Sequence, residues 1–227
     1  MNYEFFTLMM IVCFFISIFA STSLKSTYKK YMKIQNSSHF SGAQVAASIL
    51  RQFGINDVRV EETSGELSDH YDPRYKVVRL STENYHGTSI AAVSVAAHEC
   101  GHAIQHATEY VPVVVRSKMV PVVNFANKMS YGLFALSLFI KNYETVLKIA
   151  FLIFFVTFLF QMVTLPVEFD ASKRALKILN SSNVLQEHEM KGSKKVLKAA
   201  AFTYVAGVLY SLMQVLRILS LLNRRNS

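Results

Sequence analysis

Four long apolar runs constrain this chain more than any other feature of its sequence. They cover residues 3–21, 120–140, 146–165 and 199–222. A helix needs about 20 predominantly apolar residues to cross the hydrocarbon core of a bilayer, and each run is close to that length. Hydrophobic residues make up 52% of the 227 positions, and charged residues only 17%. We therefore expect a mostly α-helical membrane protein with about four transmembrane helices.

The basic residues are clustered beside these runs. The formal net charge is +9, with one cluster directly after the first run and another between the last two. Such clusters are typical of the cytoplasmic loops of multi-pass membrane proteins. No nucleic-acid recognition motif accompanies the charge, so we expect no nucleic-acid partner. The clustered residues are Lys25, Lys29, Lys30, Lys33, Lys173, Arg174, Lys177, Lys191, Lys194, Lys195 and Lys198.

The runs and the charges together divide the chain into five segments. The basic clusters predict a multi-pass protein of the cell membrane whose catalytic segments are cytoplasmic. The five segments are a transmembrane anchor (1–23), a cytoplasmic catalytic segment (24–119), a transmembrane hairpin (120–165), a second cytoplasmic segment (166–198), and a transmembrane or interfacial helix with a tail (199–227).

The first and last segments each allow two readings. A cleaved signal peptide would normally carry Lys or Arg before its apolar run, and this chain has only Glu4 there, so we favour an uncleaved anchor. At the other end, a full span over 199–222 would place Arg224 and Arg225 outside the cell, against the charge rule. We therefore keep both a spanning and an interfacial helix for this segment.

The first cytoplasmic segment predicts a small α+β unit. A helix is expected over residues 41–54, because Ser41 can cap its start and Gly54 can end it. Short alternating strands are expected over 57–63 and 74–80. The Gly, Asp and Pro residues between the strands favour turns.

A helix that begins near Thr88 carries the sequence "AAHECGHAI". His98 and His102 are four residues apart, so they project from one face and can bind one zinc ion. Glu99 is rotated by about 100° from His98 and can act as general base towards a water that the zinc activates for attack on a carbonyl. The Ala and Ile residues around the motif predict a buried face, where unpaired His and Glu would be costly. We therefore predict one catalytic zinc ion.

A third zinc ligand must come from outside this motif, since a catalytic zinc usually has three protein ligands and one open position. The metzincin spacing would require a histidine at position 108, which is Thr108. We favour Glu168 in "LPVEFDASK" (165–173), where Pro166 can open a helix as the third run leaves the membrane. The acidic residues that we disfavour are Glu109, too near the motif, Glu144, across the membrane, and Glu187 and Glu189, in a stretch expected to be a solvated loop.

Two further side chains are candidates for supporting the zinc ligands. Asp170 follows Glu168 by two residues and can either contact a ligand or form an ion pair with Arg174. His106 continues the stripe of the two motif histidines by one more turn. It either supports the site or lies on the surface.

Other residues near the motif carry weaker signals. Cys100 is expected to be a small buried thiol, and Cys13 lies in an apolar run, so no disulfide is expected. Gly101 should allow another backbone or the substrate to approach the helix closely. Hydrolysis also needs a donor for the oxyanion, and the sequence leaves five candidates open: His70, Tyr71, Tyr85, His86 and His106.

The sequence "AAHECGHAIQH", followed by "LPVEFDASKRA", resembles the YugP-like neutral zinc metallopeptidases of bacterial membranes. The resemblance covers nearly the whole chain, including "DHYDPRYKVVRLS" and "TSIAAVSVAAHE". More distantly, the chain is similar to HtpX-type and CAAX prenyl membrane proteases, which hold zinc by HExxH and a downstream Glu. This resemblance implies a gluzincin-like zinc peptidase domain. Those relatives carry an Asp four residues after the third ligand, where this chain has Ser172.

Together these features favour a membrane-bound zinc endopeptidase with its active site on the cytoplasmic side, near the bilayer. Its expected partners are the lipid bilayer and a peptide or membrane-protein substrate, and the sequence assigns no oligomeric state. The alternative is a zinc-binding membrane sensor or scaffold without proteolytic activity, although such a protein would not need Glu99 as a base. An intramembrane protease is disfavoured, because the helix that carries the motif is too polar at its ends to cross a bilayer.

Overall fold

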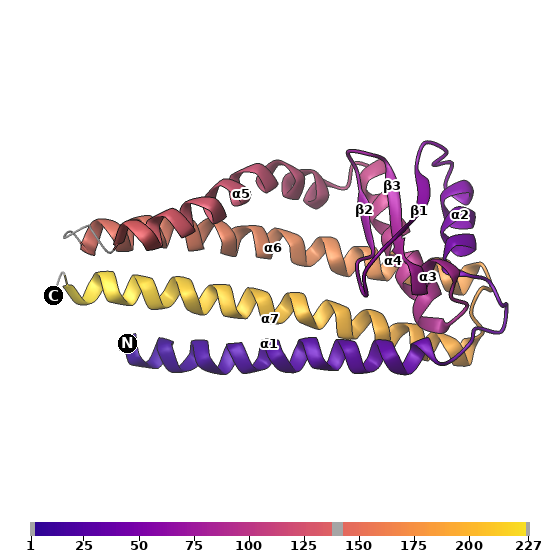
Figure 1. The fold of residues 1–227 in the computed structure, drawn as a ribbon, viewed down its shortest axis with the longest axis horizontal. Helices are drawn as coiled ribbons and strands as arrows, with labels where there is room; N and C mark the ends of the chain where they lie inside the picture. The colour runs from indigo at the N-terminus through magenta and orange to yellow at the C-terminus, as the bar shows by residue number, and fades with distance from the viewer. Residues whose placement is uncertain (1–2, 138–142, 226–227) are drawn as a thin grey trace.

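A computed structural model describes residues 3–137 and 143–225. Four long helices lie side by side, and a small α+β unit lies at one end of them (Figure 1). The helices, in chain order, are α1 (Tyr3–Met32), α5 (Val111–Ser137), α6 (Tyr143–Ser181) and α7 (Glu187–Arg225). The chain enters the α+β unit from α1 and leaves it along α5, and both termini lie at the opposite end of the long helices (Figure 1).

Within the described residues, three of these helices are long and apolar enough to cross a membrane: α1, α6 and α7. Large apolar side chains such as Phe15 and Phe19 on α1 are exposed, as expected for a surface that faces lipid. α5 is not among the three, and Asn124, Asn127 and Lys128 interrupt its apolar run. Part of the second expected span, and of the turn after it, lies outside the described residues. A membrane span over this second run, residues 120–140, therefore stays a prediction.

α6 continues without a break through Pro166, so the expectation of a helix that opens at this proline is wrong. Proline inside a helix removes one backbone hydrogen bond and usually weakens the helix there. Here α6 packs against a neighbour on each side of the proline: Gly207 of α7 lies against Gln161, and Gly101 lies against Ala171. This packing supports the helix, and Glu168 consequently lies in a helix interior.

The α+β unit begins with α2 (Gly42–Gln52), as the sequence predicted. The Ser41 hydroxyl accepts a hydrogen bond from the Gln44 amide, and the Gln44 side chain accepts one from the Ser41 amide, which forms a capping box. Gly54 follows the helix with φ of +69°, a conformation that glycine adopts readily.

The sheet has three strands in the order β1-β3-β2. β1 (Arg59–Thr63) pairs in parallel with β3 (Val77–Ser81), and β2 (His70–Asp72) pairs antiparallel with β3. β1 and β3 were expected, but β2 lies where only turns were expected, so that part of the prediction was wrong. Three residues are too few to show an alternating pattern in the sequence.

Asp69 holds the start of β2 in place. Its carboxylate accepts hydrogen bonds from the Ser81 amide at 2.8 Å and from the Asn84 side chain at 2.9 Å. Asn84 lies in the short helix α3 (Thr82–His86) and also accepts a hydrogen bond from the Tyr28 hydroxyl of α1 at 3.0 Å. These bonds tie β2, β3 and α1 together, and they leave β2 at an edge of the sheet.

The helix that carries HExxH is α4 (Ile90–Ala107), and it lies in the centre of the α+β unit. Ser89 caps it, as its side chain accepts a hydrogen bond from the Ala92 amide. The helix packs against α2, α6 and α7. One buried contact joins the hydroxyls of Ser94 and of Ser193 on α7, 2.7 Å apart.

The stretch before the last apolar run is not the solvated loop that the sequence suggested. α7 begins at Glu187, and the next acidic residue, Glu189, is buried. Its carboxylate accepts hydrogen bonds from the Ser37 amide and hydroxyl and from the Gln186 amide. These three bonds hold the start of α7 against the loop after α1, and they provide the partners that make burial of this charge possible.

Candidate metal centre

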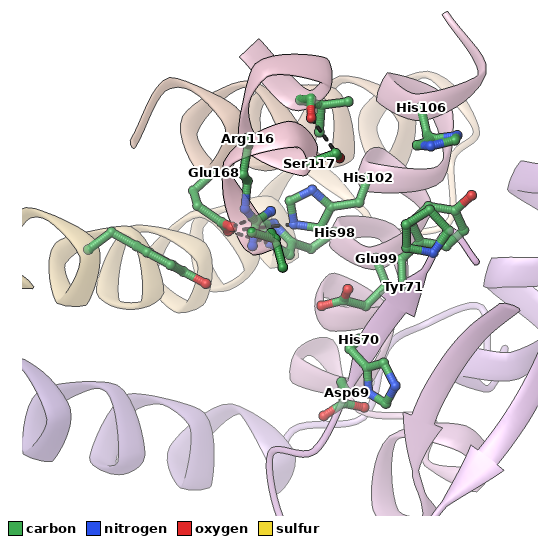
Figure 2. Close-up of a pocket in the computed structure, with 14 residues that line it drawn as sticks. Asp69, His70, Tyr71, His98, Glu99, His102, His106, Arg116, Ser117 and Glu168 are labelled. Carbon is green, nitrogen blue, oxygen red and sulfur yellow. Dashed lines mark hydrogen bonds and ion pairs between the residues drawn. The ribbon is translucent and has the colours of Figure 1, made fainter. Parts of the chain in front are cut away.

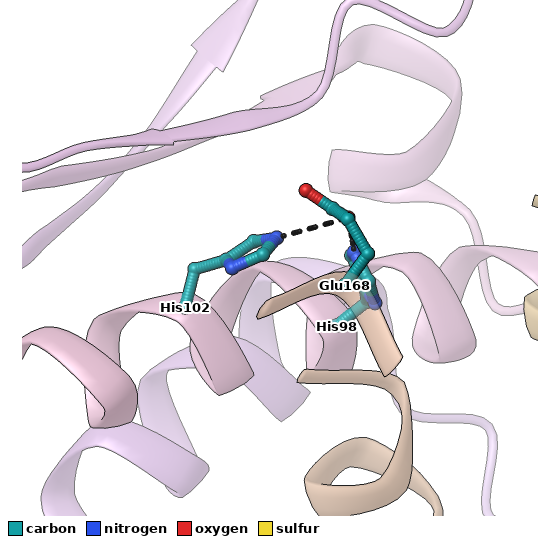
Figure 3. Close-up of side chains that lie close together, drawn as sticks. All are labelled: His98, His102 and Glu168. Atoms are coloured by element: carbon teal, nitrogen blue, oxygen red, sulfur yellow. Dashed lines mark ion pairs between the residues drawn. The ribbon is translucent and has the colours of Figure 1, made fainter. Parts of the chain in front are cut away.

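α4 places His98 and His102 side by side on one face, one turn apart. The centroids of their imidazole rings are 4.7 Å apart, with the rings nearly perpendicular. Each side chain is only about one eighth exposed, at 13% and 12%. The Nε2 atoms of both rings point towards α6 (Figure 3).

α6 reaches this face because Gly101 lets its backbone come very close to α4. A Cβ atom at Gly101 would lie 2.7 Å from the carbonyl oxygen of Ala171, which is too short for any side chain. The sequence predicted such an approach without naming the partner, and the structure identifies it as α6. The contact brings Glu168, about one turn before Ala171, opposite the two histidines.

The three side chains place their ligand atoms around one point (Figure 3). Glu168 Oε2 lies 3.3 Å from His98 Nε2 and 3.5 Å from His102 Nε2, and all three atoms lie within 4.8 Å of one another. With bonds of about 2.1 Å, two ligands of a tetrahedral zinc lie about 3.4 Å apart. The two distances to Glu168 therefore fit a shared ion of this size.

The carboxylate of Glu168 is incompletely hydrogen-bonded, which favours a cation beside it. It is 2% exposed, and its Oε2 atom is buried without a hydrogen-bond partner among the described residues. Its other oxygen, Oε1, lies 3.6 Å from a guanidinium nitrogen of Arg116 on α5. An unsatisfied carboxylate oxygen is costly inside a protein unless a cation or donor meets it. The donor set of two imidazoles and one carboxylate suits zinc.

The electrostatics of the cluster favour an ionised carboxylate. Burial would raise the pKa of Glu168, but the facing His102 and His98 outweigh burial and hold this pKa well below its usual value. Burial would likewise lower the pKa of His102, but Glu168 raises it above the usual value. The site therefore attracts positive charge, which a bound metal ion would supply in place of a proton.

The remaining nitrogen of each imidazole has a polar partner. His98 Nδ1 lies 3.2 Å from the Ser172 hydroxyl, and His102 Nδ1 lies 3.0 Å from the side-chain oxygen of Gln105. Gln105 in turn donates to the carboxylate of Asp170 at 2.9 Å. A partner at Nδ1 leaves Nε2 free to bind a metal and fixes the direction of the ring.

Asp170 thus pairs with Arg174, one of the two alternatives that the sequence left open, and it is linked to the candidate ligand His102 only through Gln105. It accepts the hydrogen bond from Gln105, and it also accepts one from Arg174, one turn further along α6. Ser172, four residues after Glu168, contacts His98 directly. Gln105 was not expected at the site, although its position three residues after His102 on the same helix was a usable signal.

Glu99 lies beside the cluster and lines the same cavity of about 280 Å³ (Figure 2). Its side chain comes from α4, and the residue is 8% exposed. β2 contributes His70 and Tyr71 to the cavity wall, and α5 contributes Arg116 and Ser117. The cavity therefore lies between the edge strand of the sheet and the long helices.

Several cavity residues escaped the sequence analysis, and two of them, Arg116 and Tyr204, have polar groups that interact with Glu168. Arg116 stands on α5, well after the motif, and no spacing rule links it to the histidines. Tyr204 reaches the cavity from α7, within the last apolar run, where its phenol is one of a few polar groups. Only the packing of α5 and α7 beside α6 brings these side chains to the site.

The candidates for oxyanion stabilisation separate into two groups. His70, Tyr71 and His106 line the cavity, and the rings of Tyr71 and His106 lie 6.0 Å apart. Tyr85 and His86 are not among its lining residues, and His86 contacts Glu62 at 3.1 Å. His106 itself is exposed, and it is not one of the three residues that share ligand distances.

Cys100 lies on the opposite side of α4 from the metal cluster. It is fully buried, and its thiol lies 3.6 Å from the carbonyl oxygen of Ala46 in α2. Burial raises the pKa of this thiol, so it stays protonated. The residue is a packing thiol, as expected, and Cys13 is likewise a free buried cysteine.

Comparison with known proteins adds the family. Residues 6–223 match the family described as "Putative neutral zinc metallopeptidase". The chain is also 44% identical over 212 residues to a Bacillus subtilis protein named "Putative membrane protease YugP", which covers 93% of this chain and 94% of the relative. No solved structure matches the chain. With nearly the whole length matched in both comparisons, the chain belongs to this family, described as neutral zinc metallopeptidases.

Proposed function

We propose that this protein is a membrane-bound zinc endopeptidase whose zinc is held by His98, His102 and Glu168. The proposal is carried by one observation: a buried, unsatisfied oxygen of Glu168 faces two imidazole nitrogens at distances that suit a shared tetrahedral ion. A zinc ion there would polarise the scissile carbonyl and lower the pKa of the attacking water. One ion is enough, because the three ligand atoms surround a single point.

Glu99 acts as the general base in this mechanism. It lines the cavity directly beside the ligands without being one of the three clustered residues. Its carboxylate takes the proton of the attacking water and passes it to the leaving amine. His70 and Tyr71 of β2, together with His106 further along α4, line the same cavity and provide donors for the negative charge that develops on the substrate carbonyl.

The substrate binds as an extended peptide along β2. This strand is at the edge of the sheet, it is paired with β3 on one side, and two of its residues line the cavity. An edge strand can pair with a peptide through backbone hydrogen bonds, which accept many sequences. The cavity also borders α5 and α7, so segments of membrane proteins close to the bilayer are suitable substrates.

The Glu99→Gln variant tests the enzymatic mechanism. It should retain zinc, because Glu99 is not a ligand, and lose 10²–10⁴-fold in peptide cleavage, the range typical of general acid–base catalysis. His98→Ala should lose both zinc and activity. Metal content by mass spectrometry and cleavage of a peptide library by the two purified variants provide the comparison. A zinc-loaded Glu99→Gln protein that cleaves as fast as the parent would refute the mechanism and favour a zinc-binding sensor or scaffold.

We further propose that the α+β unit and the metal centre face the cytoplasm of a multi-pass membrane protein. The lysines of α1 and α7 at the end near this unit support that orientation. An impermeant thiol reagent applied outside cells should label a cysteine at Asn142, which lies outside the described residues, and spare one at Ser64. Background labelling should be low, since Cys13 and Cys100 are buried. Labelling at Ser64 alone would reverse the orientation.

A further inference from the structure

A second charged cavity, of about 360 Å³, lies between α1 and α7 and is separate from the metal centre. Lys30 lines it from α1, and Lys195 and Lys198 line it from α7. The two helices run side by side here, one leading towards the α+β unit and the other away from it (Figure 1). Three ammonium groups therefore face one hollow from both sides.

Within the described chain, none of these three lysines forms an ion pair with an acidic side chain. The neighbouring Lys29, by contrast, lies 3.8 Å from Glu66. Lys30 stands near the ring of Tyr31, at 5.8 Å from its centroid, which does not balance its charge. Like charges that share a hollow repel one another, so an anion there would relieve the repulsion.

The cavity also offers hydroxyl donors. Ser23 and Thr27 line it from α1, one turn apart. The nearby hydroxyls of Ser21 and Thr22 donate to backbone carbonyls of their own helix. In the described part of the chain, Ser23 and Thr27 have no such bond, so their hydroxyls are available to a ligand. Ammonium and hydroxyl donors together are the groups that bind phosphate oxygens.

The position of the cavity matches the level of lipid headgroups. The first apolar run ends at residue 21, just before Ser23, and the last begins at residue 199, just after Lys198. From Ser23 to Lys30 the helix rises about 10 Å, enough to cross the headgroup region of about 5–7 Å on one side of a bilayer. Phe202 lines the membrane side of the cavity and is 38% exposed, which provides an apolar surface for an acyl chain.

We propose that this cavity binds the phosphate headgroup of an anionic phospholipid, with the acyl chains along Phe202 and the apolar part of α1. Basic pockets between transmembrane helices are suited to such headgroups. A lipid is a better occupant than a free phosphate, because the cavity joins the charged and apolar parts of both helices. The site would reinforce the α1–α7 pair, and α7 contacts the HExxH helix through Ser193 and Ser94.

The test compares binding of phosphatidylglycerol and phosphatidylcholine to the purified full-length chain by native mass spectrometry. The parent should prefer phosphatidylglycerol. Replacing Lys30, Lys195 and Lys198 by Gln together should weaken phosphatidylglycerol binding on the order of 100-fold, from the effect of three lysines at a membrane surface. A milder variant, Ser23→Ala with Thr27→Ala, keeps the charge and should weaken the same binding less.

A matched variant removes three lysines outside the cavity, Lys25, Lys33 and Lys191, by the same change to Gln. It has the same net charge as the cavity variant, and because these three lysines do not line the cavity, it should weaken phosphatidylglycerol binding far less than the cavity variant does. Equal losses in both lysine variants would show that only the overall charge matters and would overturn the site. Full displacement by an excess of soluble glycerol phosphate would instead indicate a free anion site. If the triple variant does not fold, unchanged binding by the hydroxyl variant would refute the proposal.

Discussion

Two buried glutamates of this protein differ in a way that distinguishes a structural carboxylate from a candidate metal ligand. Glu168 and Glu189 are 2% and 3% exposed, and each lies on a long helix. Glu189 accepts three hydrogen bonds, at 2.7, 2.9 and 2.8 Å, which occupy both of its oxygens. Glu168 has one oxygen without any hydrogen bond, and that oxygen faces two imidazoles.

The comparison shows that burial alone does not identify a ligand. A buried carboxylate with a full set of donors is already stable, and a metal ion would have to displace them. A buried carboxylate with an unpaired oxygen is destabilising, and binding of a cation at that oxygen would remove the cost. The sequence disfavoured Glu189 on the ground that it was solvated. Glu189 is in fact buried, so that reason was wrong. The three hydrogen bonds that its carboxylate accepts now argue against a role as a zinc ligand.

The largest expected effect comes from replacing each of these two glutamates by alanine and comparing zinc binding and stability. Glu168→Ala should weaken zinc binding by more than about 100-fold, because loss of a direct ligand should exceed the 10–100-fold effects of supporting residues. Glu189→Ala should leave zinc binding unchanged and lower the free energy of unfolding by about 3 kcal/mol, because it leaves buried donors unpaired. Zinc retention during dialysis against a chelator and thermal unfolding measure the two effects.

His106→Ala is a suitable control for this pair, since His106 lines the cavity without belonging to the metal cluster. It should keep both zinc and stability. The distinction fails if Glu189→Ala loses zinc as readily as Glu168→Ala while the protein remains folded.

A smaller effect on zinc binding is expected from the residues that contact the zinc ligands, and Ser172 is the clearest example. Ser172→Ala removes the hydroxyl that lies 3.2 Å from His98 Nδ1 and should weaken zinc binding by about tenfold. Ser172→Asp, which introduces a carboxylate beside His98 Nδ1, should keep or strengthen zinc binding. A competition titration with a fluorescent zinc chelator measures both. Unchanged affinity in Ser172→Ala would show that this hydroxyl does not orient the ring.

Local signals in the sequence predicted the parts of the fold that depend on neighbouring residues. Ser41 caps its helix, Gly54 ends it, and the HExxH helix forms where the spacing predicted it. Gly101 was expected to permit a close approach, and it does. Each of these features follows from residues within a few positions of one another, so the chain itself carries the information.

The features that the sequence missed depend on distant partners. β2 forms because Asp69 bonds to Ser81 and Asn84, more than ten residues away. α6 continues through Pro166 because neighbouring helices support it, which a local rule for proline does not include. Arg116 and Tyr204 reach the site only through the packing of α5 and α7. Such placements follow from tertiary packing, which overrides local preference.

The close contact between Gly101 and Ala171 also fixes α6 at a point very near the candidate metal centre, so that a tilt of α6 would pivot about this contact. Glu168 lies three residues from this pivot, about 4.5 Å along the axis, whereas Tyr143 at the far end lies about 42 Å away. If α6 tilts as a rigid rod, a displacement at the far end is reduced roughly ninefold at the carboxylate. Movements of the surrounding bilayer would therefore reach the Glu168 carboxylate strongly attenuated, and its position relative to the two histidines of α4 would change little.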